Sequence, residues 1–243
     1  MYLLTAPMFG SKHLLGLLFV VLLNVALYFV FRKYVKDERK FVVVAMIAFY
    51  TMEVLKLGYL MIRDGSFPMN HIPLHLCSAP LYVYLIWYLA KPGSWLYQAA
   101  KATAFGVVLI AAIAALVIPV NIIGGDLTWA FSQDNLLPYL SFTFHGFMIF
   151  AAWYIIKAGY LKPHWSNVIQ AIALTSVLMV IALIVNLAFD KDYMLLNTGN
   201  GSPLVFLRDI SQLLYTLSMI LLGYFMIALT FSIAILVTKK DPS

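Results

Sequence analysis

Long runs of apolar residues alternate with short polar connections along almost the whole chain. A helix needs about 20 mostly apolar residues to cross the hydrocarbon core of a bilayer. By this length criterion the pattern predicts seven spanning helices, over residues 13–32, 41–62, 71–90, 97–120, 139–158, 167–189 and 211–238. We therefore expect an all-α, polytopic membrane protein in which residues 1–243 form a single seven-helix bundle.

The composition excludes a soluble globule. Of the 243 residues, 63% are hydrophobic and 11% are charged, whereas a soluble domain carries about 25% charged residues. A net charge of +6 would suggest nucleic acid in a soluble chain, but here the basic residues lie between apolar runs. We therefore expect a lipid bilayer and lipids as partners, and no nucleic acid. Cys77 is the only cysteine, so no internal disulfide can form.

Lysine and arginine are distributed unequally between the two ends of the predicted helices. One end carries Arg32, Lys33, Lys36, Arg39, Lys40, Lys91, Lys101, Lys157, Lys162, Lys239 and Lys240. The other carries only Lys12, Arg63, Lys191 and Arg208. Since cytoplasmic loops are enriched in lysine and arginine, we expect the N-terminus outside and the C-terminus in the cytoplasm. The localisation predicted is the cell membrane, multi-pass, in a bacterial cytoplasmic membrane.

Ionisable side chains within the apolar runs are candidate functional groups, because charge is costly in lipid. Glu53 and Lys56 lie three residues apart in the second run and share a helical face. They can be a mutually neutralised pair that fastens two helices. They can equally orient a histidine or hold a lipid head group, and the sequence leaves both interpretations open.

The third run begins with two histidines, a thiol and a hydroxyl within eight residues. On a regular helix His71, His75 and Ser78 would share one face, and Cys77 would point away from His75. A base for Cys77 is therefore expected from another helix. The residues Ser141 to His145 of the fifth run supply one at a similar depth, in the predicted outer half of the membrane.

A Cys77–His145 pair makes chemical sense for acyl transfer. The thiolate is the nucleophile, and an imidazole can take its proton. The same histidines also permit a metal-dependent membrane hydrolase, with His71, His75 and His145 as ligands. A third hypothesis is a non-enzymatic protein that binds or transports a lipid or small solute. The thioester mechanism needs no metal or cofactor.

A charged loop over residues 190–210 is predicted to face outside. Tyr193 and Arg208 of this loop are candidate substrate-binding residues, and an arginine suits a phosphate. The loop can cap the site, or it can be an ordinary solvated connection.

Three short blocks resemble the bacterial YwaF-like integral membrane proteins. Residues 71–78 resemble that family's Leu-Pro-Leu-His-Leu-Cys-Ser signature, residues 138–146 its second block, which ends in His-Gly, and residues 192–196 its Asn-Tyr-Met-Phe-Leu block. The order of the blocks and the seven-helix layout also match, over roughly residues 40–225. This chain departs from the family at Asp192, where Asn is usual, and at residues 197–199, which replace a frequent Lys-Pro.

The resemblance implies a reaction. Eukaryotic relatives of that family include a transmembrane phospholipid acyltransferase with a proposed Cys and His catalytic pair. Their positions match Cys77 and His145, and His75 and Glu53 would then be supporting residues. Our first hypothesis is therefore a lipid acyltransferase working through a Cys77 thioester, with phospholipid or lysolipid substrates entering from the outer leaflet.

Overall fold

The computed structural model describes residues 9–118, 136–199, 202 and 204–239, which form helices and connections without any strand. The α-helices are α1 (Ser11–Tyr34), α2 (Glu38–Asp64), α3 (Ala79–Leu89), α4 (Trp95–Val117), α5 (Leu137–Lys157), α6 (Trp165–Phe189) and α7 (Gln212–Lys239). Short 3₁₀ turns occur at η1 (Met69–His71), η2 (Leu76–Ser78), η4 (Tyr193–Leu195) and η5 (Val205–Asp209). The all-helical prediction is confirmed for this part of the chain.

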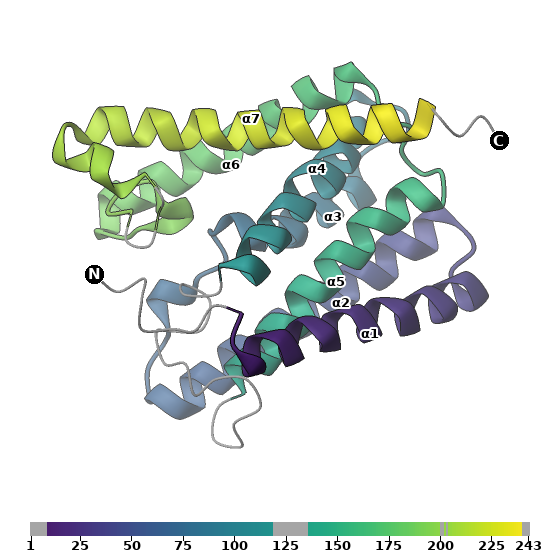
Figure 1. The fold of residues 1–243 in the computed structure, drawn as a ribbon, viewed down its shortest axis with the longest axis horizontal. Helices are drawn as coiled ribbons and strands as arrows, with labels where there is room; N and C mark the ends of the chain where they lie inside the picture. The colour runs from purple at the N-terminus through teal and green to yellow at the C-terminus, as the bar shows by residue number, and fades with distance from the viewer. Residues whose placement is uncertain (1–8, 119–135, 200–201, 203, 240–243) are drawn as a thin grey trace.

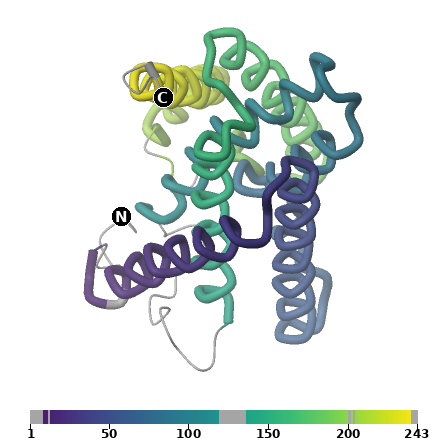
Figure 2. Tube along the Cα trace, turned by 90° about the vertical axis from the view of Figure 1, so that its right-hand side faces the viewer, coloured from purple at the N-terminus to yellow at the C-terminus, as the bar shows by residue number. Residues whose placement is uncertain are grey.

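Successive helices run in opposite directions in Figure 1, and Figure 2 shows the same bundle from its right-hand side. Contacts between α2 and α3 illustrate the pattern, because the Tyr50 hydroxyl donates to the Leu81 carbonyl at 2.9 Å while Phe41 packs against Trp87 at 6.0 Å. The bundle therefore has two ends, which we call the Glu38 end and the Asp64 end after the first and last residues of α2.

Helix α4 lies at the centre of the bundle and packs against α3, α5, α6 and α7. Its buried face is built largely from small residues: Ala99, Ala100, Ala102, Ala104, Gly106, Ala111 and Ala112. Small residues allow helix backbones to approach closely in a membrane, where the packing of side chains drives association. At Gly106 an added Cβ would lie 2.6 Å from the Phe231 ring of α7.

An aromatic cluster joins α1, α2 and α5 near the Glu38 end. Phe31 packs edge-on against Phe150 at 4.7 Å, and Phe41 stacks on Tyr154 at 5.4 Å. Such pairs favour offset or edge-to-face geometry because of the charge distribution of the rings. Nearer the Asp64 end, Asn24 of α1 donates to the Gly146 carbonyl of α5 at 3.1 Å.

Glu38 gathers three donors at its own end of the bundle. Lys101 Nζ lies 3.0 Å from Glu38 Oε1, the Trp87 indole donates to the same oxygen at 3.1 Å, and the Tyr97 hydroxyl donates to it as well. Lys101 lies within α4, as the predicted helix over 97–120 implies, and it is buried. A buried ammonium needs such a partner, because burying an unpaired charge is costly.

The prediction of a regular spanning helix over 71–90 is wrong. Helix α3 has 11 residues, and Leu76–Leu89 is too short for the span criterion that six other helices meet in the described residues. Pro73 is one physical reason, because proline lacks an N–H and holds the preceding residue extended, and Ile72 has ψ 137°. Pro80 suits the first turn of α3. The side of each terminus and a seventh membrane crossing both stay predictions.

His13 is buried at the start of α1. Its Nε2 lies 2.7 Å from the Leu116 carbonyl oxygen of α4. This contact joins the start of α1 to the end of α4. A pattern of apolar runs cannot show such a contact, because it reports the ends of helices and not their neighbours.

We expect Gly106→Ala to lower the free energy of unfolding by about 1–3 kcal/mol, because the new methyl group overlaps the buried Phe231 ring. The measurement is thermal unfolding of the purified protein in detergent micelles. Gly223→Ala in α7 is the matched control, since an added Cβ there meets nothing within 4 Å. Equal loss of stability in the two variants would contradict the close approach of α4 and α7.

Candidate functional site

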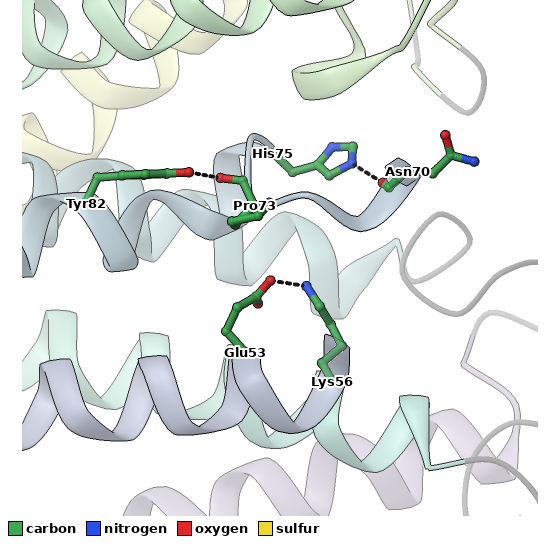
Figure 3. A network of polar contacts seen from close by, with 6 residues as sticks. All are labelled: Glu53, Lys56, Asn70, Pro73, His75 and Tyr82. Atoms are coloured by element: carbon green, nitrogen blue, oxygen red, sulfur yellow. Dashed lines mark hydrogen bonds and ion pairs between the residues drawn. The ribbon is translucent and has the colours of Figure 1, made fainter. Parts of the chain in front are cut away.

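The candidate site lies toward the Asp64 end of α2, where Glu53 and Lys56 project toward the chain that precedes α3 (Figure 3). Lys56 Nζ lies 2.8 Å from Glu53 Oε1, an ion pair in which this oxygen accepts no well-directed hydrogen bond. Glu53 is buried, whereas the Lys56 side chain is 28% exposed. The predicted pairing on one helical face is therefore present, and the Lys56 ammonium keeps donors for another group.

An irregular segment, residues 69–78, connects the end of α2 to α3. Three of its carbonyl groups are satisfied by side chains. The Tyr82 hydroxyl donates to Pro73 at 2.5 Å, the Tyr193 hydroxyl donates to Met69, and His75 Nε2 lies 3.4 Å from the Asn70 oxygen (Figure 3). Irregular backbone near lipid must have its polar groups satisfied by protein or water, so these contacts allow the segment to stay non-helical.

The irregular segment removes the helical face that was expected to join His71, His75 and Ser78. His75 is extended, with φ −76° and ψ 159°. His71 is exposed, Ser78 is buried and Cys77 is partly buried. The i, i+4, i+7 argument therefore fails, because it assumed a regular helix from residue 71 onward.

His145 is buried in the first half of α5, with one ring nitrogen occupied and the other free. Its Nδ1 lies 2.7 Å from the Ser141 carbonyl oxygen and 3.3 Å from the Ser141 hydroxyl. A carbonyl can only accept, so the neutral ring carries its proton on Nδ1. Its Nε2 is buried without a hydrogen-bond partner. A buried acceptor without a donor is unusual, because most buried polar atoms in proteins are hydrogen-bonded.

The Lys56 ammonium connects these elements. It lies near enough to act electrostatically on His71, His75, Cys77 and His145. The end of the irregular segment, η2, packs against α3 and α4, α3 packs against α2, and α2 also packs against α5. Cys77 does not hydrogen-bond His145 here, since Nε2 has no partner. Lys56 thus acts electrostatically on both members of the predicted pair, which are not hydrogen-bonded to each other.

Tyr193 brings the loop after α6 onto the irregular segment. Its ring packs edge-on against His75 at 5.2 Å. Asn186 of α6 holds its backbone, accepting from the Tyr193 N–H at 2.7 Å and donating to its carbonyl at 2.9 Å. The sequence left open whether this loop caps the site, and the structure shows that Tyr193 of the loop contacts His75.

Asp192 organises the same loop. Its Oδ1 accepts from the Asn197 N–H at 2.8 Å, and its Oδ2 accepts from the Gly199 N–H at 2.8 Å and from the Thr198 hydroxyl. A side chain that accepts from nearby backbone N–H groups fixes a turn. The carboxylate therefore holds the chain that follows Tyr193 in one conformation.

Two sequence-based candidates do not join the site. Arg208 is exposed and donates to the Thr198 carbonyl at 3.0 Å and to the Gln212 side chain at 3.2 Å. The three histidines of the hydrolase hypothesis do not form a metal centre either. Among the residues that the structure describes, no group of three or more His, Cys, Asp or Glu side chains is placed to hold a metal ion.

Sequence reasoning missed Asn186 and Tyr82. Asn186 is a buried amide within an apolar run. The rule that identified Glu53, that polar side chains within membrane segments are costly and rare, also applied to Asn186. Tyr82 had no signal, because tyrosine is common in and around membrane helices. Its contact with Pro73 depends on the irregular backbone before α3, which the pattern of apolar runs does not show.

The fold and the site define a polytopic helical membrane protein with a polar centre toward one end of its bundle. A family model described as the TMEM164 family matches residues 8–229, and the chain belongs to this family of transmembrane proteins. No curated protein matches the chain, and no solved structure matches it.

We expect Tyr193→Phe to expose Cys77. Losing the hydrogen bond to Met69 costs about 1 kcal/mol, which raises the open population of the irregular segment about fivefold. The measurement is the rate of maleimide labelling, which reports one site because Cys77 is the only cysteine. Tyr215→Phe is the control, since the Tyr215 hydroxyl of α7 donates to the Leu195 carbonyl and not to the irregular segment. Equal labelling rates in both variants would show that Tyr193 does not cover the site.

Proposed function

We propose that this protein transfers acyl chains between membrane lipids through a thioester on Cys77. The observation that carries the proposal is the unpartnered Nε2 of buried His145, a residue on which Lys56 acts electrostatically, as it does on the chain's single thiol. A hydrolytic metal centre lacks a comparable observation. The resemblance to the YwaF-like proteins supports the same pair of residues.

In the first half-reaction His145 Nε2 takes the Cys77 proton. The thiolate attacks the carbonyl carbon of a lipid ester, so that a C–S bond forms and the ester C–O bond breaks. The imidazolium returns its proton to the departing alkoxide, which leaves as a lysolipid. Because Nδ1 is held by the Ser141 carbonyl, Nε2 is the nitrogen that exchanges the proton in every step.

The second half-reaction runs in reverse with a different acceptor. His145 takes the proton of an acceptor hydroxyl or amine, which then attacks the thioester carbonyl. The C–S bond breaks, and the proton passes to the departing Cys77 sulfur. The buried Ser78 hydroxyl, or a backbone N–H, steadies the oxyanion of each tetrahedral intermediate.

Lys56 supports the nucleophile by charge. Its ammonium acts electrostatically on Cys77, and a nearby cation favours a thiolate over a thiol. Glu53 holds the ammonium in place through the ion pair. His75, which bonds the Asn70 carbonyl and packs on Tyr193, is assigned a positioning role.

Substrate binding completes the pair in this mechanism. Catalytic hydrogen bonds are often long in the free enzyme and shorten in the complex with substrate. The irregular segment carries Cys77, and its backbone is held by three side-chain contacts instead of a helical ladder. A lipid that contacts this segment can bring Sγ to Nε2 without unwinding a helix.

We expect Cys77→Ser and His145→Gln to abolish acyl transfer from labelled phospholipid to a mixed set of lysolipid and amine acceptors in micelles. Intact mass should show an acyl adduct in the wild type that is absent from Cys77→Ser. Lys33→Gln is the surface control, because Lys33 is exposed at the other end of the bundle, and it should keep wild-type turnover.

Two results would contradict the thioester. Full turnover in Cys77→Ser would exclude a covalent step at sulfur, and chelator sensitivity would then favour metal-dependent hydrolysis. Lipid binding without turnover in any acceptor mixture would favour a lipid-binding or transport protein.

A second prediction concerns Lys56. Lys56→Met should move the pH–rate profile of acyl transfer to higher pH by about one unit, because the thiolate loses a nearby positive charge. The double variant Glu53→Gln/Lys56→Met controls for the unpaired carboxylate that the single variant leaves buried. An unchanged profile in both variants, with turnover retained, would show that Lys56 only fastens the helices.

A further inference from the structure

An open pocket lies at the Glu38 end, across the bundle from the candidate site. Its volume is about 410 Å³, and its polar lining residues include Gln98, Lys101, Tyr160, Lys162, His164 and Gln170. These residues come from α4, from α6 and from the connection between α5 and α6. Ligand pockets commonly have volumes of about 300–1,000 Å³, so there is room for a phosphate and an attached organic group.

The lining carries positive charge. Lys101 and Lys162 both line the pocket, and the described lining residues include no aspartate or glutamate. The Lys101 ammonium forms an ion pair with Glu38 Oε1, which also accepts hydrogen bonds from Trp87 and Tyr97. Lys162 is exposed, so its ammonium can turn toward a ligand at little cost.

Neutral donors complete the lining. Burial raises the pKa of Tyr160 to about 12, so its hydroxyl stays protonated at neutral pH. Asp37 and Glu38 also act electrostatically on Tyr160. Both carboxylates have partners of their own, since Asp37 accepts from the Lys40 N–H at 2.8 Å and Glu38 pairs with Lys101. The first turn of α6 also opens onto the pocket, and the N-terminus of a helix carries partial positive charge.

The surroundings suit a ligand that sits at a membrane surface. Trp95 and Trp165, the first residues of α4 and α6, are exposed at this end. Tryptophan is enriched where lipid head groups meet the hydrocarbon core. Lysines near such a surface attract anionic lipids.

We propose that this pocket binds a phosphate-bearing anion, the head group of an acidic phospholipid. Lys162 supplies the free positive charge, the Glu38-paired ammonium of Lys101 donates a further hydrogen bond, and the hydroxyl and amide groups of Tyr160, Gln98 and Gln170 orient the head group. The site is separate from the Cys77 neighbourhood and does not depend on the proposed acyl transfer.

The test measures lipid binding to the purified full chain in neutral detergent by native mass spectrometry. Phosphatidylglycerol and phosphatidylcholine are titrated in parallel, and glycerol phosphate is the soluble probe. Lys162→Gln should weaken phosphatidylglycerol binding about tenfold, because one charge-assisted contact is lost. Lys157→Gln is the matched control, since Lys157 is exposed at the end of α5 and does not line the pocket.

Each outcome decides the proposal. Preference for phosphatidylglycerol that falls in Lys162→Gln and persists in Lys157→Gln supports an acidic lipid. Glycerol phosphate binding with the same dependence on Lys162 supports the phosphate site with a soluble ligand. Equal binding of the two lipids by the wild type, or equal effects of the two substitutions, would overturn it. Acyl transfer is not measured, so the result is independent of the proposed function.

Discussion

The arrangement of the candidate site follows from one constraint: a backbone carbonyl in an apolar surrounding must find a donor. The irregular segment leaves its carbonyls without the ladder that a helix supplies. Tyr82, Tyr193 and His75 replace that ladder at three positions. Each donor comes from a different place along the chain, so the segment, the start of α3 and the loop after α6 must be built together. Cys77 then lies in the short 3₁₀ turn η2, outside the hydrogen-bond ladder of α3.

Most of the fold could be predicted from the sequence, because lipid imposes a length that apolar runs reveal directly. Six of the seven predicted spans lie within two or three residues of helices in the structure. The run over 71–90 failed because apolar composition does not register the effect of Pro73 on the backbone. The partner of Lys101 was equally hidden, since the pattern shows that a lysine is near a helix end and not that Glu38 neutralises it there.

The positions of the candidate site residues along the helix axes were predictable, but their lateral neighbours in the bundle were not. Glu53, Lys56 and His145 were identified because polar groups in apolar runs are rare, and the structure places all three toward one end of the bundle. Which of them approach one another depends on how the helices pack around α4, and a single sequence contains no measure of that packing. The role of Ser141 became clear only through its carbonyl, which fixes the tautomer of His145.

The bonds of Asp192 link two features of the sequence that seemed separate. A carboxylate offers only acceptors, and here it accepts from the Gly199 N–H and the Thr198 hydroxyl on the same oxygen. An asparagine, usual in the YwaF-like block, would present an N–H to one of these groups, and a proline in this stretch would remove a donor. The acidic residue and the Thr-Gly pair thus depend on each other. Substituting either one alone should loosen the loop that carries Tyr193.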